Sequence, residues 1–300
     1  MRSSRRSTPQ GVADLAGDTW RENGIGGKGE QVSEFPAADE LLSIAVPVAR
    51  EAAATARRMR AEAITDVETK STRTDVVTAA DRAVERQVVS SLRTIRPHDG
   101  VLGEEYGENT PKSGAVRWIL DQIDGTVNYL YGLPAYAVSL AAEVDGVVVA
   151  GVVINAATGD EWTATRGGGA WRGARRLRCS TRTELSQVLL GTGFGYDAKR
   201  RAHQGAVLAQ LITRVRDIRR IGVASLDLCS VGEGMLDAYY EKGLNPWDHA
   251  AGGLIAAEAG ALVGGLEGAP PGLDMVVAAP PAIFGPLHDA LVSLDAAGGA

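Results

Sequence analysis

The sequence predicts an α/β fold of the α+β or layered kind, in which helices pack on mixed sheets. Apolar residues between Asp39 and Arg60 recur with the spacing of one helix face. Residues 136–179 alternate between polar and apolar and are interrupted by repeated turn signals, as in an antiparallel meander. Residues 116–120 form an apolar run of strand length that ends at an acidic residue. Helices and antiparallel strands in one chain favour layers that share a core.

The N-terminal part of the chain divides into an extension and two helices. Residues 1–38 are rich in Gly, Ser, Arg and Glu and show no periodicity, which predicts a mobile extension. A helix is expected over 39–60, with Pro47 as a candidate kink. Thr78 is the expected N-cap of a second amphipathic helix that ends before Pro97.

The remainder of the chain alternates between strands and helices. Asp145-Gly146 and Thr158-Gly159 are hairpin signals within the meander. We expect one folded domain over 39–300, with an α+β half over 39–180 and an α/β half over 181–300. The elements expected in the second half are helices over 202–215, 225–232 and 247–259 and a strand over 236–241.

The composition excludes several classes of function. With 45% hydrophobic and 23% charged residues, the 300-residue chain has the make-up of an ordinary globular protein. Its formal charge of −6 provides no basic field to attract nucleic acid, and no apolar run approaches the length of a membrane span. Cys179 and Cys229 have neither disulfide-framework nor metal-site spacing, which favours a reducing compartment, the cytoplasm. We expect neither a nucleic acid nor a membrane as partner.

The densest group of acidic residues is Asp121-Gln122-Ile123-Asp124-Gly125-Thr126. A turn at the end of the preceding strand would direct both carboxylates to one place, where they and a backbone carbonyl suit a hard divalent cation. The backbone N–H groups of Gly125 and Thr126, at a predicted helix start, suit a phosphate oxygen. The alternative, which this motif alone leaves open, is a simple turn with an N-cap.

Two further acidic motifs lie elsewhere in the chain. Glu104 and Glu105 follow a short apolar pair and are either solvated charges or a ligand near a metal-activated water. Asp248 opens the helix expected over 247–259 and is either a favourable anion in its first turn or another ligand. The small residues 250–253 behind Asp248 would let this helix approach another backbone closely.

Taken together, these motifs resemble the inositol monophosphatase family of metal-dependent, lithium-sensitive phosphatases. The resemblance runs in the family's order from about Leu41 to Ala261. It implies a layered α-β-α-β-α sandwich of the sugar-phosphatase type. The motifs that carry it are Lys70, Thr78-Ala79-Ala80-Asp81, Gly103-Glu104-Glu105, residues 121–128, Tyr239-Tyr240-Glu241 and Trp247-Asp248.

The resemblance also implies a role for each matching position. A metal-activated water, oriented by Glu104 and by a Thr126 hydroxyl that Asp81 holds, would attack phosphorus in line. The implied ligands of two to three Mg²⁺ ions are Glu104, Asp121, the carbonyl of Ile123, Asp124 and Asp248. The implied substrate contacts are Asp124, Gly125, Thr126, Gly222, Val223, Ala224, Glu241 and Asp248, with Lys70 as an accessory residue.

The activity implied by the resemblance is hydrolysis of inositol monophosphate by a cytoplasmic homodimer. Rival phosphate esters within the family are histidinol phosphate, fructose 1,6-bisphosphate and 3′-phosphoadenosine 5′-phosphate, and Glu241 behind two tyrosines favours inositol phosphate. Two alternatives are not enzymes: a transcription-associated binding factor, and a structural domain with vestigial acidic residues. The intact acidic positions argue against both. One departure is Gln122, which stands where the family has Pro and predicts a looser loop with weaker metal binding.

Overall fold

The structure is a computed structural model that describes residues 37–62, 68–69, 76–77, 79–105, 107–109 and 116–299. These residues belong to one compact unit, residues 35–300. The extension expected over 1–38 lies almost wholly outside the described residues, and Lys70 and Thr78 lie outside them as well. None of the described helices combines the length and the apolar character needed to cross a membrane.

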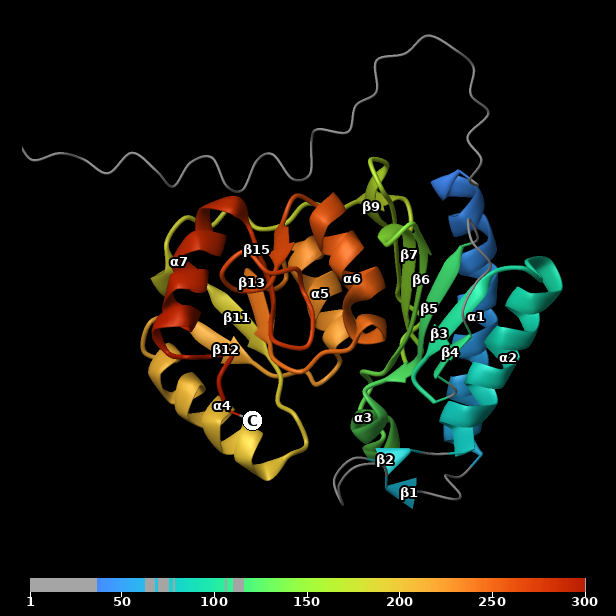
Figure 1. Cartoon of the computed structure of the whole chain (residues 1–300), viewed down its shortest axis with the longest axis horizontal. Helices are drawn as coiled ribbons and strands as arrows, with labels where there is room; N and C mark the ends of the chain where they lie inside the picture. The colour runs from blue at the N-terminus through green and yellow to red at the C-terminus, as the bar shows by residue number, and fades with distance from the viewer. Residues whose placement is uncertain are drawn as a thin grey trace, which may run out of the picture. The chain divides into compact units, whose positions relative to one another are not determined.

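An eight-stranded sheet contains the first half of the fold (Figure 1). Its strand order is β10-β9-β8-β7-β6-β5-β3-β4, and all neighbours are antiparallel except β3 and β5. Strands β6 to β10 confirm the meander expected over 136–179. Asp145 and Gly146 both have positive φ, 50° and 78°, as a tight two-residue hairpin between β6 and β7 requires. The strands are β3 (Gly100–Gly103), β4 (Gly107–Asn109), β5 (Arg117–Asp124), β6 (Ala137–Val144), β7 (Val147–Asn155), β8 (Glu161–Thr165), β9 (Gly169–Arg172) and β10 (Arg175–Arg176).

A five-stranded sheet contains the second half, in the order β12-β11-β13-β15-β14. β11 is parallel to both β12 and β13, whereas β15 is antiparallel to β13 and β14. Its strands are β11 (Leu189–Thr192), β12 (Asp217–Arg219), β13 (Ala238–Glu241), β14 (Leu262–Gly264) and β15 (Val276–Ala279). A separate antiparallel pair is formed by β1 (Glu68–Thr69) and β2 (Val76–Val77).

The helices form three layers that alternate with the two sheets (Figure 1). α1 and α2 cover one face of the eight-stranded sheet, α5 and α6 lie between the sheets, and α4 and α7 cover the far face of the five-stranded sheet. This arrangement confirms the expected α-β-α-β-α sandwich. The helices are α1 (Ala38–Ala61), α2 (Ala79–Ile95), α3 (Thr126–Tyr131), α4 (Ala198–Leu211), α5 (Ala224–Glu233), α6 (Pro246–Glu258) and α7 (Pro281–Ser293), and a short 3₁₀ turn spans Leu185–Gln187.

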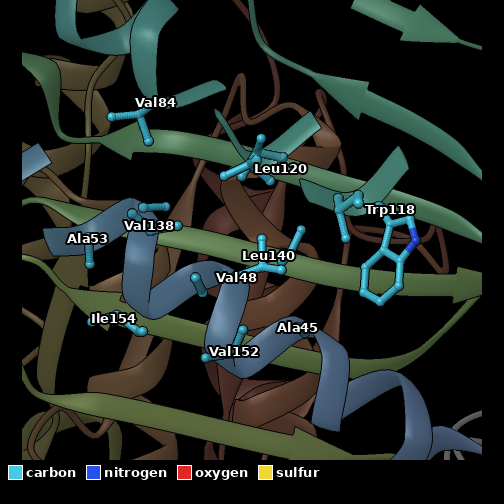
Figure 2. Close-up of a cluster of buried hydrophobic side chains, with 14 of the residues drawn as sticks. Ala45, Val48, Ala53, Val84, Trp118, Leu120, Val138, Leu140, Val152 and Ile154 are labelled. Carbon is cyan, nitrogen blue, oxygen red and sulfur yellow. The ribbon is translucent and has the colours of Figure 1, made fainter. Parts of the chain in front are cut away.

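The core beneath α1 and α2 shows why the sequence folds this way (Figure 2). Trp118 and Leu120 of β5 point toward the helices, while Ile119 between them packs on the opposite face of the sheet, toward α6. Because β5 is buried on both faces, residues 118–120 are all apolar rather than alternating with polar residues. The side chains labelled in Figure 2 are Ala45, Val48, Ala53, Val84, Trp118, Leu120, Val138, Leu140, Val152 and Ile154, and all are buried.

Several elements differ from the expectation. α1 continues through Pro47 as one helix. β5 does not end at residue 120 but runs on to Asp124. α4 begins at Ala198 rather than at residue 202, because the Asp197 side chain accepts the backbone N–H groups of Lys199 and Arg200 and caps the helix there. β11, β14, β15 and α7 were not expected at all.

Candidate functional site

The first two acidic motifs meet at one edge of the eight-stranded sheet. β3 and β5 are parallel neighbours, and Gly103 of β3 pairs with Leu120 of β5. The residues that follow, Glu104 and Asp121, therefore lie side by side at the carboxyl ends of the paired segments. The charge of Glu104 is one of the causes that raise the pKa of Asp121. The register of two strands thus brings together residues 17 positions apart in sequence.

A β-bulge brings the two carboxylates of the Asp121 motif together. Asp121 pairs with Ser139 and Asp124 with Ala137, so three steps along β5 match two steps along β6. In a regular strand, residues three positions apart point to opposite faces of the sheet. The extra residue of a bulge changes this alternation and redirects the side chains that follow it. The turn expected at this point is instead a bulge within the strand.

The third acidic motif is delivered by the first turn of α6. The side chain of Asp248 accepts the backbone N–H of Asn245 at 2.7 Å, and the two residues form a capping box. Small residues let α6 lie close against the sheet, as predicted: a Cβ added at Gly151 of β7 would lie 3.1 Å from the Cα of Ala251. The hydroxyl of Ser139 on β6 also donates to the carbonyl of Trp247 at 3.3 Å.

Asp121, Asp124 and Asp248 converge on one point. Each offers one carboxylate oxygen, and these three oxygens lie within 4.8 Å of one another. Burial and the neighbouring carboxylates raise the pKa of Asp121 and of Asp248 well above the usual range. Burial also raises the pKa of Asp124, to about 6. Among the described residues this group has three members, and Glu104 stands beside it rather than in it.

This group of oxygens fits a hard divalent cation. Mg²⁺ prefers carboxylate oxygens, and the group supplies three of them at one place. Like charges packed this closely in a buried site repel one another, and a bound cation would remove that repulsion. Burial is the largest cause that raises the pKa of Asp121 and of Asp248, and the charge of Asp124 raises both pKa values further, which is the sign of this repulsion in the protein alone.

Asp124 is also tied to the start of α5. The backbone N–H of Ser225 donates to its carboxylate at 2.7 Å, at the positive end of the helix dipole. Gly125 has φ of 90° and a Cβ there would lie 2.7 Å from a methyl group of Val223, so glycine is required where β5 turns into α3. The Asn128 side chain donates to the carbonyl of Ile221 at 3.0 Å and fastens the same two segments together.

Thr126 lies between the carboxylate group and α2. Its hydroxyl is 3.5 Å from a carboxylate oxygen of the fully buried Asp81 and 3.2 Å from the carbonyl of Ile123. That carbonyl is the backbone oxygen expected to serve as a metal ligand, and the N–H of the same residue donates to Asp121 at 3.0 Å. The contact expected between Thr126 and Asp81 is therefore present.

Two contacts beside Glu104 were not recognised in the sequence. The carboxylate of Glu85, fully buried on α2, accepts the backbone N–H of Glu105 at 3.0 Å. A Cβ at Gly103 would overlap the other oxygen of the same carboxylate. The buried amide of Gln122 donates to Glu104 at 3.2 Å, a contact that the proline expected there would not make. Glu85 was detectable, since it follows Asp81 by one helical turn inside an apolar stripe.

The residues expected to contact the substrate lie at the start of α5 and the end of β13. Gly222 has φ of 84°, and Val223 and Ala224 are buried at the helix start that also binds Asp124. Burial raises the pKa of Glu241 to about 7, and the charge of Asp124 contributes to this rise. Glu241 is therefore electrostatically linked to the group of three carboxylates.

Comparison with known proteins identifies relatives along most of the chain. The model of the inositol monophosphatase family matches residues 37–292. An inositol-1-monophosphatase of Mycobacterium leprae is 50% identical over 272 residues, which are 84% of this chain and 94% of the relative. A Nus factor SuhB of Salmonella typhimurium is 37% identical over 230 residues, 76% of this chain and 86% of the relative. The solved structure of Mycobacterium tuberculosis SuhB superimposes with a TM-score of 0.75 at 44% identity and covers 88% of this chain and 100% of that one.

Proposed function

Because the chain belongs to the inositol monophosphatase family and is thus a metal-dependent phosphatase, we propose that it hydrolyses inositol 1-phosphate to inositol and phosphate with Mg²⁺. The observation that carries this proposal is the convergence of Asp121, Asp124 and Asp248 within 4.8 Å. The relative from Mycobacterium leprae, named for this activity, supports the choice of substrate.

The ligands proposed for two to three Mg²⁺ ions are those that the family resemblance implies, and the convergence of Asp121, Asp124 and Asp248 supports them. Glu104, Asp121 and the carbonyl of Ile123 would hold one ion, and Asp121, Asp124 and Asp248 would hold a second. A third ion would be held more weakly through Glu104. When bound, such ions neutralise charge on the phosphoryl oxygens and make hydroxide available near neutral pH.

Protein groups would position the attacking water for in-line displacement. We assign Glu104 and the Thr126 hydroxyl as its acceptors, with Asp81 fixing the orientation of that hydroxyl. Backbone N–H groups of Gly125 and Thr126 would hold phosphate oxygens. Positioning and charge neutralisation are what phosphoryl transfer chiefly requires, so no covalent phosphoenzyme is proposed.

The leaving group would lie toward the second half of the fold. The backbone of Gly222, Val223 and Ala224 would line the polyol, and Glu241 would accept hydrogen bonds from its hydroxyl groups. Asp248 would contact the hydroxyl nearest the metal ions. The role of Lys70, outside the described residues, remains an accessory one in this proposal.

Phosphate release from a panel of esters tests the proposal. The panel contains inositol 1-phosphate, histidinol phosphate, fructose 1,6-bisphosphate and 3′-phosphoadenosine 5′-phosphate, each with Mg²⁺, with a chelator, and with Mg²⁺ plus Li⁺. We expect turnover that requires Mg²⁺, is fastest on inositol 1-phosphate and is inhibited by Li⁺. Faster turnover of another ester would reassign the substrate, and turnover in chelator would contradict the metal sites.

A second candidate function is a binding role in transcription, which the relative named Nus factor SuhB favours. Asp121→Asn separates the two functions, since it removes a proposed ligand without changing the surface. If this variant lacks phosphatase activity but restores the cellular phenotype of a deletion strain, the binding role is the physiological one. We also propose a cytoplasmic homodimer, which sedimentation and cell fractionation would test.

A further inference from the structure

Glu241 is held by a buried tyrosine on its own strand. Tyr239 and Glu241 are two positions apart on β13, so their side chains share one face of the five-stranded sheet. The phenol hydroxyl of Tyr239 donates to Oε2 of Glu241. Tyr239 is fully buried, and it packs with apolar residues of α5 and α6. The hydroxyl is thus fixed by a rigid, packed ring rather than by a mobile surface side chain.

The same carboxylate is bounded on its other side by backbone. Gly193 follows β11, the parallel neighbour of β13. A Cβ on Gly193 would overlap both carboxylate oxygens of Glu241, so the carboxylate lies directly over this glycine. Because Glu241 is confined between Tyr239 and Gly193, its side chain has little rotamer freedom even before the substrate binds. An unconfined glutamate would lose this freedom, at a cost in entropy, only on binding.

We infer that Tyr239 is a positioning residue that gives the enzyme its preference for leaving groups with hydroxyl groups, by holding Glu241 in the orientation that accepts their hydrogen bonds. The inference rests on the function proposed above, in which Glu241 contacts the polyol. With Oε2 engaged by the phenol, Oε1 is the oxygen that accepts from the substrate. A pre-oriented acceptor discriminates because its orientation is fixed before the substrate binds.

Tyr239→Phe tests this inference, because it removes one oxygen atom and retains the packed ring. Its matched control is Tyr240→Phe. Tyr240 is equally part of β13 and nearly as buried, but it packs on the opposite face of the sheet with residues of α4 and α7. Each variant is assayed with inositol 1-phosphate and with 4-nitrophenyl phosphate, whose leaving group bears no aliphatic hydroxyl.

For Tyr239→Phe we expect the KM for inositol 1-phosphate to rise about 5- to 20-fold, the effect of one disordered hydrogen bond, with kcat changed less than about 2-fold. The KM and kcat for 4-nitrophenyl phosphate should be unchanged. Tyr240→Phe should leave both constants unchanged for both substrates. Gly193→Ala, which displaces Glu241 from the other side, should reproduce the pattern of Tyr239→Phe.

Other outcomes overturn the inference. Equal losses on both substrates in Tyr239→Phe would show a structural role only, and an unchanged KM for inositol 1-phosphate would show that Glu241 needs no such support. If Tyr239→Phe fails to fold, as judged by circular dichroism, Gly193→Ala decides in its place. If the wild-type enzyme hydrolyses 4-nitrophenyl phosphate but not inositol 1-phosphate, the proposed function fails, and the inference fails with it.

Discussion

Replacing Asp124 by Asn should make the metal-free protein more stable. In the absence of metal, burial raises the pKa of the Asp124 carboxylate from the usual 3.8 to about 6. At pH 7.5 the ionised side chain of Asp124 therefore destabilises the folded state. An asparagine carries no charge, and its side-chain oxygen still accepts the N–H of Ser225, which donates to Asp124 at 2.7 Å.

The size of this effect follows from the pKa. A rise from 3.8 to about 6 corresponds to about 3 kcal/mol, since one pKa unit is worth about 1.4 kcal/mol. For a folded unit of this size, about 3 kcal/mol raises the unfolding temperature by about 6–12 °C. The sign reverses the usual case for a carboxylate: the folded state binds the proton more tightly than the unfolded state. The increase in the free energy of unfolding that Asp124→Asn brings is therefore fully present above pH 6, and it disappears as the pH falls from 6 to 3.8.

Saturating Mg²⁺ should reverse the order of stability. A ligand at 1,000 times its Kd stabilises the folded state by about 4.1 kcal/mol, which exceeds the gain of about 3 kcal/mol expected for Asp124→Asn. The wild-type protein gains this stabilisation, whereas Asp124→Asn lacks a proposed ligand and gains little. The three carboxylates would then destabilise the metal-free protein and stabilise the metal-bound one. Their cost in stability without metal is of the kind that functional sites commonly carry.

Asp237 provides a matched control for Asp124. The two residues are equally buried, with 9% and 8% of their surface exposed, and the side chain of Asp237 accepts the N–H of Leu189 at 2.8 Å. The guanidinium of Arg182 lies 3.7 Å from the carboxylate of Asp237 and can offset its charge. Asp237→Asn should therefore leave the unfolding temperature unchanged or lower it.

Thermal unfolding followed by circular dichroism, in chelator and in Mg²⁺, measures all three proteins. Unfolding of Asp124→Asn below the wild-type temperature, in chelator at pH 7.5, would refute the predicted destabilisation by the buried Asp124 carboxylate. Equal stabilisation of Asp237→Asn would refute it as well, because the effect would then not depend on whether a neighbouring cation offsets the burial of the carboxylate.

Three further predictions follow from single contacts. Glu85→Ala removes the acceptor of the Glu105 N–H and should raise the Mg²⁺ concentration for half-maximal activity about 10-fold, whereas Glu85→Gln, which keeps an acceptor, should restore it. Thr126→Val removes the hydroxyl near Asp81 and should lower kcat about 100-fold or more while the unfolding temperature stays within a few degrees. Gly151→Val would force α6 away from β7 and should lower the stability by about 1–3 kcal/mol in denaturant unfolding, and an unchanged midpoint would contradict the close packing described here.

Much of the fold could be predicted because its signals are local. The helical spacing over 39–60 and the hairpin turns of the meander depend only on neighbouring residues, and both are confirmed. β15 was missed because four residues buried on both faces show no alternation. α7 was missed because Pro281 and Pro286 suggest a break, although Pro281 occupies the first helical turn, where proline is tolerated.

The site was less accessible to sequence reasoning, because its geometry is non-local. The residue types were identified from motifs, but nothing local predicts the bulge that lets Asp121 and Asp124 point to one place. Gln122 was expected only to loosen its loop, and its hydrogen bond to Glu104 depends on the neighbouring strand. The contact of Tyr239 with Glu241 did carry a local signal, since residues two apart on a strand share a face.

The role of the carboxylate group in catalysis is tested by the Mg²⁺ dependence of phosphate release from inositol 1-phosphate, measured for the wild-type enzyme and for Asp121→Asn. We expect no release in chelator, activation of the wild type as Mg²⁺ is added, and a loss of at least about 100-fold in the variant at every Mg²⁺ concentration. Wild-type activity in chelator, or an Asp121→Asn variant as active as the wild type, would contradict the claim that these carboxylates form the catalytic metal site.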